Sequence, residues 1–282
     1  MAWPPYDEPV DDAWARVERV AADRESGAAQ IARRAAVALA DLPSERLWAA
    51  IELLLRGHPS MAPLWRLAND VLAALDTADG RDMAEEVATA PAATARAASA
   101  FLILLDSDRG AAAAAAAVLP DRVLTLSYSS TVVEAIRLRR PQQTVCMRSE
   151  PGGEGWRVAE ETRDCTWPVV MEDEEAIEKL PCDAILVGAD AVTPGGAVNK
   201  VKTRALAEAG RARAIPRYAV AGEAKFIGTA LPLRPPFEST PLELFTSVAV
   251  PGSLYGPDEA RVHAKAIILH PTLERLLERI AG

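Results

Sequence analysis

The chain has 282 residues, half of them hydrophobic, and a formal net charge of −9. This length suits one large domain or two modest ones, and the apolar fraction supplies a substantial core. The negative balance argues against a general binder of nucleic acids or of anionic membranes, but it allows a small anionic ligand in a local basic pocket. No apolar run approaches the length of a membrane span, and the first residues do not resemble a signal sequence.

Three cysteines, Cys146, Cys165 and Cys182, are scattered along the chain without a CxxC pair. This usage indicates reduced thiols and a cytoplasmic protein. The three histidines show no metal-ligand spacing, so we expect no metal ion and no other cofactor. Abundant alanine and arginine with little lysine is typical of a GC-rich bacterial coding bias.

Residues 1–118 have the pattern of a helical domain that begins with a proline-rich, loose arm at residues 1–10. Apolar residues recur at helical spacing, and Ser44 is a suitable N-cap for one helix. The seven-alanine run at residues 111–117 has a high helix propensity and predicts a close-packed helix rather than a linker. Helices are expected at residues 12–24, 30–42, from 44 onwards, 62–75, 83–105 and 111–117.

After Pro120 the pattern changes to short apolar strands that alternate with helices. This βαβ rhythm predicts an α/β fold, in which a Rossmann-like, doubly wound parallel sheet over residues 119–282 follows the N-terminal helical domain. Residues 234–257 are rich in proline and receive no assignment. Strands are expected at residues 123–126, 144–147, 167–171, 184–187 and 217–220, and helices at 130–140, 156–163, 173–180, 198–209 and 272–280.

The most informative segment is residues 182–190, an apolar run that ends in Gly188, Ala189 and Asp190. The run shows no alternation, which is typical of a parallel strand buried on both faces. In open α/β sheets ligands bind beyond the carboxyl ends of the strands, where a carboxylate is costly to bury unless something uses it. Asp190 alone would be interpreted as a turn former or a cap. Asn199 and Lys200, placed at the start of the helix expected at 198–209, instead favour a site for phosphate and hydroxyl groups.

Residues 187–196 and 198–201 together resemble the signature of one superfamily. It contains the alpha, beta and delta subunits of translation initiation factor 2B, methylthioribose-1-phosphate isomerase and ribose-1,5-bisphosphate isomerase. The resemblance runs over roughly residues 20–230. It implies an N-terminal helical domain, a C-terminal Rossmann-like domain, and a dimer formed through the latter.

Further blocks resemble the same family in the same order, at residues 26–28, 59–64, 124–130, 151–155 and 225–226. The block at 124–130 resembles the strand-to-helix motif of the initiation-factor branch. Together with the serine turn and the Asn-Lys pair, the resemblance implies a ligand site. Its expected residues are Gly27, Ala28, His58, Pro59, Ser60, Ser127, Ser129, Ser130, Gly188, Asp190, Asn199, Lys200 and Lys225.

The departures from the family bear on catalysis. The isomerases pair the aspartate of Gly-Ala-Asp with a cysteine in a Leu-Thr-x-Cys motif, because aldose–ketose interconversion needs an acid and a base. Ser127 occupies that cysteine position, and a hydroxyl has a far higher pKa than a thiol. Cys146 falls in the middle of the next strand and is interpreted as core. The catalytic candidates are therefore Asp190 and Ser127, if the protein catalyses a reaction at all.

Other departures concern charge. His58 stands where the family has an arginine before Pro59. Arg148 and Glu150 exchange the two charges of the family's Glu-Ser-Arg-Pro. The exchange has no effect if the two residues pair with each other. If the family arginine contacts phosphate, Glu150 would repel the phosphate. Lys202 replaces a common glycine, and a solvated helix residue is preferred over an added phosphate contact.

These features favour a non-catalytic or regulatory protein that binds a phosphorylated sugar or a nucleoside monophosphate. Asp190 would hold ribose-like hydroxyls, Asn199 and Lys200 would hold phosphate, and the serine turn would add hydroxyl and backbone N–H groups. An aldose–ketose isomerase with altered catalytic residues and a structural subunit of a protein assembly remain as alternatives. We expect a homodimer without nucleic-acid or membrane partners, and the sequence names no protein partner.

Overall fold

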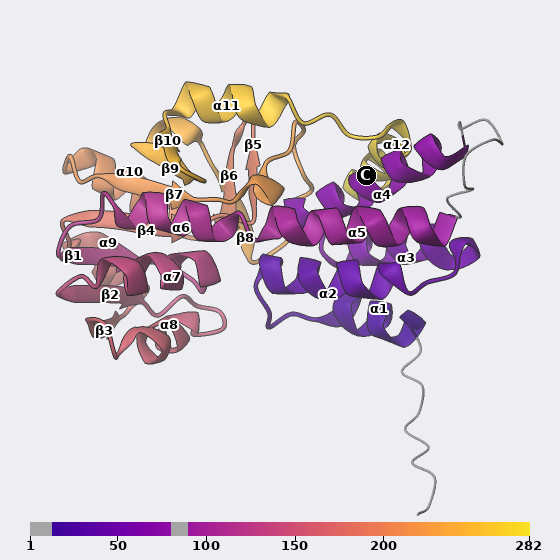
Figure 1. The fold of residues 1–282 in the computed structure, drawn as a ribbon. Helices are drawn as coiled ribbons and strands as arrows, with labels where there is room; N and C mark the ends of the chain where they lie inside the picture. Colours follow the sequence, from indigo (N-terminus) through magenta and orange to yellow (C-terminus); the bar gives the residue numbers. More distant parts are fainter. Residues whose placement is uncertain (1–12, 80–89) are drawn as a thin grey trace, which may run out of the picture.

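The computed structural model of the protein describes residues 13–79 and 90–282. Helices fill the first part of the chain, and a seven-stranded sheet flanked by helices follows (Figure 1). The predicted α/β fold is therefore confirmed. The arm expected at residues 1–10, the helix start at Asp12 and the helical positions 83–89 lie outside the described residues. Within the described ranges, no helix is both long and apolar enough to cross a membrane.

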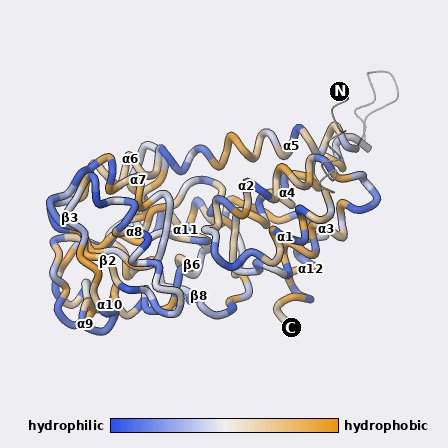
Figure 2. The backbone as a smooth tube through the Cα atoms, turned by 90° about the horizontal axis from the view of Figure 1, so that it is seen from below, coloured by the Kyte–Doolittle hydropathy of each residue, from blue (hydrophilic) through white to orange (hydrophobic). Residues whose placement is uncertain are grey.

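The helical region consists of helices that each bury one face in a common core. Hydrophobic and hydrophilic residues both occur along these helices (Figure 2), and Trp65 and Phe101 are among the largest fully buried side chains. The C-terminal helix α12 (Pro271–Ala281) packs against α4 and adds Leu273 and Leu276 to this core. The earlier helices are α1 (Ala13–Ala22), α2 (Ala28–Ala40), α3 (Ser44–Gly57), α4 (Ala62–Asp79) and α5 (Ala90–Leu105).

Helix α6 (Asp108–Ala116) contains most of the seven-alanine run and joins the two parts of the molecule. Ala111, Ala112 and Ala115 are fully buried, and α6 packs against α7 (Ser130–Arg139) and strand β9 (Ser247–Val250). The short side chains allow the close approach, because the interior tolerates few voids. The prediction of a close-packed helix is confirmed.

The main sheet has the strand order β10-β9-β7-β4-β1-β2-β3. The strands pair in parallel except for β10, which is antiparallel to β9. From β1 the chain moves through β2 to β3 on one side, and from β4 it moves through β7 to β9 on the other. The strands are β1 (Arg122–Thr125), β2 (Gln143–Met147), β3 (Trp167–Met171), β4 (Ala184–Gly188), β7 (Arg217–Val220), β9 and β10 (Ser253–Tyr255).

Helices cover both faces of this sheet. Neighbouring side chains on a strand point to opposite faces, so each face has a core of its own. Leu186 packs in a core with α6, α7 and α8, whereas its neighbours Ile185 and Val187 pack in a core with α9, α10 and α11. Burial on both faces accounts for the non-alternating apolar run in β4. The flanking helices are α8 (Glu154–Thr162), α9 (Asp173–Lys179), α10 (Thr203–Ala212) and α11 (Pro257–Lys265).

Strand β3 forms one edge of the main sheet and pairs only with β2. The N–H of Trp167 donates to the carbonyl of Gln142 on the β2 side, at 3.1 Å. Because backbone groups alternate in direction along a strand, Pro168 faces the open edge. Proline lacks an N–H group, so this position offers no donor to a further strand.

The helix expected at residues 198–209 is wrong over residues 198–202. Residues 196–200 form strand β6 (Gly196–Lys200), and α10 begins only at Thr203. A two-residue turn at Pro194 and Gly195 joins β6 to β5 (Ala191–Thr193), and β6 also pairs with β8 (Phe237–Thr240). The backbone of Asn199 and Lys200 is therefore held in an antiparallel ladder rather than at a helix start.

The proline-rich segment without a predicted element contains regular structure. Besides β8, β9 and β10 it includes the short 3-10 helix η2 (Leu242–Leu244). A similar turn, η1 (Glu223–Lys225), follows β7. Proline breaks up the strands of this segment into runs of three or four residues, which hides their periodicity in the sequence.

Candidate ligand site at the switch point of the sheet

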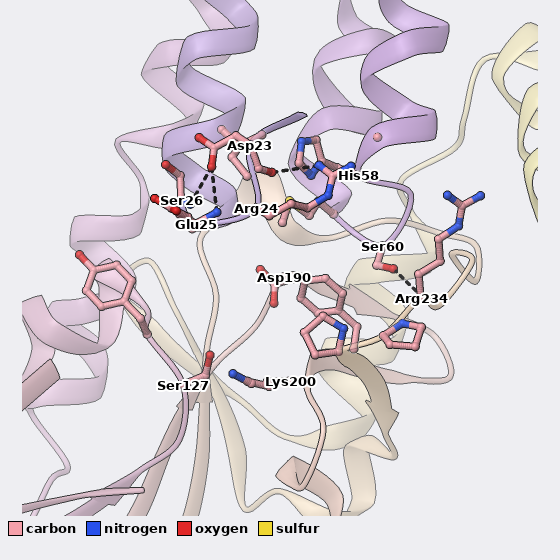
Figure 3. Close-up of a pocket in the computed structure, with 18 of the residues that line it drawn as sticks. Asp23, Arg24, Glu25, Ser26, His58, Ser60, Ser127, Asp190, Lys200 and Arg234 are labelled. Carbon is pink, nitrogen blue, oxygen red and sulfur yellow. Dashed lines mark hydrogen bonds between the residues drawn. The ribbon is translucent and has the colours of Figure 1, made fainter. Parts of the chain in front are cut away.

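A cavity of about 340 Å³ lies beyond the carboxyl ends of β1 and β4. These two neighbouring strands mark the point where the chain turns to opposite sides of the sheet, which is where open α/β sheets bind ligands. Loops of the helical region close the cavity from the opposite side (Figure 3). A volume of this size suits a small organic ligand.

Asp190 follows β4 and points into the cavity (Figure 3). Its backbone is fixed from two directions: its N–H donates to the carbonyl of Val198 at 2.8 Å, and its carbonyl accepts the N–H of Ala62 at 3.0 Å. Burial raises the pKa of its carboxyl to about 6, although the charge of Lys225 partly offsets this rise. No described residue donates a hydrogen bond to the carboxylate. The carboxylate is therefore a partly desolvated acceptor available to a ligand hydroxyl.

Ser127 follows β1 and lines the same cavity, so the structure brings the two catalytic candidates together. Its φ of 65° lies in the left-handed region, which is uncommon for a residue with a side chain. The N–H of Ser127 donates to Oγ of Ser149 at 2.8 Å, and that hydroxyl donates to the Met147 carbonyl at 2.8 Å. The Ser127 backbone N–H is thus already used, and its side chain is the group that faces the cavity.

Lys200 lines the cavity, but it does not stand at the helix N-terminus that the sequence predicts. Its side chain is buried, and its ammonium group donates to the Ser149 carbonyl at 2.6 Å, to the Pro151 carbonyl and to the carboxylate of Glu154. Three acceptors use the three donors of an ammonium group. Asn199 does not line the cavity, because it is buried and donates to Thr203 Oγ1 at 3.1 Å.

The loop between α3 and α4 forms the opposite wall. The ring of His58 lies against the Val20 carbonyl, with Nε2 at 2.7 Å, and burial lowers its pKa. A neutral imidazole whose Nε2–H donates to that carbonyl cannot replace the charge of the family arginine. The carbonyl of Pro59 accepts the Trp65 indole N–H at 3.0 Å, and Ser60 Oγ donates to the carbonyl of Pro232 at 2.7 Å.

Two arginines at the mouth of the cavity were missed by the sequence reasoning. Arg24 lies in the loop between α1 and α2, and Arg234 lies just before β8. The guanidinium of Arg24 donates to the carbonyls of Ala21 and Asp23, at 2.8 and 3.0 Å, and that of Arg234 donates to the Arg56 carbonyl at 3.3 Å. Neither arginine belongs to a recognisable motif. The placement of each one at the cavity depends on a loop whose position the sequence does not reveal.

The remaining predicted residues support the walls or lie elsewhere. Gly27 lines the cavity at the N-cap of α2, and Ala28 is the buried first residue of that helix. Ser129 caps α7 by accepting the Val132 N–H at 3.4 Å. Ser130 lines a different hollow, beside α2 and α6.

Gly188 and Lys225 act from behind the cavity wall. A Cβ atom on Gly188 would lie 2.6 Å from Cβ of Ser129, so glycine is required for β4 to approach α7. Lys225 is buried with its ammonium 4.0 Å from Oδ1 of Asp108. Neither residue contributes to the lining of the cavity.

The exchanged charges of the Arg-Ser-Glu-Pro segment pair with each other. Arg148 Nε lies 2.8 Å from Glu150 Oε1. Lys202 is not simply solvated: it precedes α10 and pairs with Asp173 at 3.0 Å and with Glu174 at 2.7 Å. Neither Arg148 nor Lys202 lines the cavity, so both serve the local structure.

Cys146 lies in the fully buried core and does not line the cavity. Burial raises the pKa of its thiol to about 12, which suppresses the reactive thiolate. The interpretation of Cys146 as core is confirmed.

The fold and the cavity define a Rossmann-type α/β protein with a cavity at the switch point of its sheet. The model of the initiation factor 2 subunit family matches residues 20–233, and the chain belongs to this family. Among curated protein sequences, none matches the chain.

Solved structures share the fold at low sequence identity. The translation initiation factor eIF-2B of Pyrococcus horikoshii OT3 is 22% identical, with a TM-score of 0.71 over 87% of this chain and 97% of that one. The tetrameric eIF2B-beta2-delta2 complex of C. thermophilum is 16% identical, with a TM-score of 0.70 over 90% of this chain and 94% of that one. The 5-methylthioribose 1-phosphate isomerase of Pyrococcus horikoshii OT3 is 18% identical, with a TM-score of 0.64 over 95% of this chain and 88% of that one.

Proposed function

We propose that the protein binds a phosphorylated sugar or a nucleoside monophosphate and does so without turning it over, in a regulatory role. The observation that carries this proposal is the pair of Asp190 and Ser127 at two adjacent strand ends in an enclosed cavity. A desolvated carboxylate without a donor among the described residues suits a ligand hydroxyl. The arginines at the mouth supply the complementary contacts for phosphate.

The absence of a thiol at the end of β1 supports binding without catalysis. Moving a proton between two carbons of a sugar requires an acid and a base that both exchange protons near neutral pH. Asp190, with its raised pKa, can serve as one of them, whereas the hydroxyl of Ser127 titrates far above this range. The buried Cys146 belongs to a core separate from the cavity lining.

Isothermal titration of the purified protein with ribose 5-phosphate and with AMP tests the proposal. We expect one of these ligands to bind the wild type and to lose at least about tenfold in affinity in Asp190→Asn, since one charge-assisted hydrogen bond is removed. Asp164→Asn is the matched control, because Asp164 is exposed and lies outside the cavity. Equal affinity in Asp190→Asn and wild type would contradict the proposed site.

A sugar-phosphate isomerase is the second candidate. The pKa of about 6 at Asp190 favours it, because a general acid or base works best near the operating pH. NMR of ribose-1,5-bisphosphate and of methylthioribose-1-phosphate incubated with the protein distinguishes the two candidates. A catalytic rate that depends on Asp190 would establish the isomerase and refute binding without turnover.

We further propose that two copies of the chain associate through the sheet region. Trp156 at the start of α8 is 63% exposed, and Trp167 on the edge strand β3 is 72% exposed. Large exposed side chains on elements that contact each other are typical of an interface. Light scattering should give twice the chain mass for the wild type and the single mass for Trp167→Glu. A monomeric wild type would refute the dimer.

A further inference from the structure

The charged groups of the cavity divide into two sets with different partners. The inner end consists of Ser127, Glu154, Asp190 and Lys200, and the mouth carries Arg24 and Arg234. Lys200 is 2% exposed, whereas both arginines are exposed. The two sets therefore present different chemistry to the two ends of a ligand.

The positive charge at the inner end is already neutralised. Lys200 gives its three donors to two backbone carbonyls and to the carboxylate of Glu154. Lys225, behind the wall, lies 4.0 Å from the carboxylate of Asp108, so its charge acts on Asp108 as well as on Asp190. With Lys200 and Glu154 forming one ion pair, ionised Asp190 leaves the inner end with a net negative charge.

A phosphate group at the inner end would meet two carboxylates, and Lys200, the cation that lines this end in the described part of the chain, is already paired. Like charges in a partly desolvated site repel strongly, whereas a hydroxyl group can donate directly to Asp190. The inner end therefore favours the uncharged, hydroxyl-bearing end of a ligand. This conclusion is the reverse of the sequence-based prediction, in which Lys200 holds phosphate.

The mouth of the cavity offers guanidinium groups to an anion. Among the described residues, Arg24 and Arg234 donate hydrogen bonds to backbone carbonyls and not to carboxylates. A guanidinium group has five N–H donors, so each arginine keeps donors available for a phosphate group.

Two carboxylates also line the mouth, but each is placed so that its repulsion of an anion is reduced. Asp23 pairs with Arg34 at 2.9 Å and accepts the backbone N–H groups of Glu25 and Ser26, at 3.0 and 2.9 Å. Glu25 is exposed, so solvent and salt screen its charge. The mouth is therefore the end of the cavity that favours phosphate.

We propose that the ligand carries a single phosphate group, which lies at the mouth between Arg24 and Arg234, while its hydroxyl-bearing end contacts Asp190. The ion pair of Glu154 and Lys200 then acts as a specificity determinant that rejects a second phosphate at the inner end. This inference rests on the proposed function, and it narrows the ligand class to monophosphates. Arg24 comes from the segment between α1 and α2 and Arg234 from the segment before β8, so the phosphate would contact two segments that lie far apart in the sequence.

Titration calorimetry with matched ligand pairs tests the inference. The pairs are ribose 5-phosphate with ribose-1,5-bisphosphate, and AMP with adenosine 3′,5′-bisphosphate. Whichever pair binds, we expect the wild type to have at least about tenfold higher affinity for its monophosphate than for its bisphosphate. The reason is that a second phosphate would face the inner carboxylates. In Glu154→Gln, which frees Lys200, the bisphosphate should gain at least about tenfold while the monophosphate changes little.

Glu150→Gln is the matched control, since Glu150 is exposed, pairs with Arg148 and lies outside the cavity. Wild-type protein that binds the bisphosphate as tightly as the monophosphate would overturn the inference but leave the proposed function intact. An unchanged preference in folded Glu154→Gln would also overturn it. If none of the four ligands binds the wild type, the proposed function fails and the inference fails with it.

Discussion

The carboxyl of Asp190 makes a testable contribution to the free energy of unfolding, apart from its proposed role in binding. Its pKa rises from 3.8 to about 6 on folding because the group is buried. This difference in pKa means that folding disfavours the charged form relative to the neutral form by about 3 kcal/mol of free energy. A raised pKa means that the folded state binds the proton more tightly than the unfolded state does. Ionised Asp190 therefore destabilises the folded protein above pH 6, and the penalty disappears as pH falls to about 4.

Asp190→Asn removes this charge and keeps the shape of the side chain. We expect the variant to exceed the wild type in free energy of unfolding by about 1 to 3 kcal/mol at about pH 7.5, and the difference to shrink towards zero at about pH 4. Urea unfolding followed by tryptophan fluorescence at the two pH values measures both quantities. Asp164→Asn should show no such gain. An Asp190→Asn variant that is no more stable than the wild type at the higher pH would refute the reasoning.

Three further outcomes are expected. Affinity for the ligand should fall by about tenfold per pH unit as pH drops below 6, because protonation removes the charge of Asp190, and calorimetry at about pH 7.5 and about pH 5 measures it. Gly188→Ala should lose about 1 to 3 kcal/mol in urea unfolding, because the new Cβ would lie 2.6 Å from Ser129, whereas Gly195→Ala meets its nearest atom at 3.8 Å and should lose less. Native wild-type protein should not react with a thiol reagent, since all three cysteines are buried, and Ser127→Cys should expose one reactive thiol. Any reactive thiol in the native wild type, or none in the variant, would contradict this placement.

The strand ends that carry the site were predictable because burial leaves a strong pattern. The apolar run before Asp190 is typical of a parallel strand, and the carboxyl end of such a strand is where a ligand binds. Ser127 follows a second strand of the same kind. Neither position depends on distant loops, so the sequence was sufficient for both.

The position of Lys200 was not predictable by the same reasoning. Val198 and Val201 lie three residues apart, which suits a helix face, but the turn at Pro194 and Gly195 makes a hairpin instead. The deciding partner is β8, which lies far along the chain. Long-range pairing of this kind overrides local propensity, because the ladder supplies the backbone hydrogen bonds.

The arginines at the mouth were missed for a related reason. Arg234 is held by its backbone N–H, which donates to Ser60 Oγ at 3.3 Å across a large separation in sequence. Ser60, which the sequence predicts as a ligand residue, thus holds the segment that carries Arg234. No local pattern marks such a contact, since it depends on how the two parts of the chain pack.

The proline at the open edge of the sheet has a consequence for how copies of the protein can assemble. An unpaired strand edge allows one chain after another to be added, which leads to open-ended polymers. Pro168 withholds a donor at this edge, so a further strand cannot complete its ladder there. The proposed association near β3 would then rely on side chains such as those of Trp156 and Trp167, which a symmetric dimer would cover on both copies. Pro168 therefore disfavours open-ended growth at this edge and is compatible with the proposed dimer.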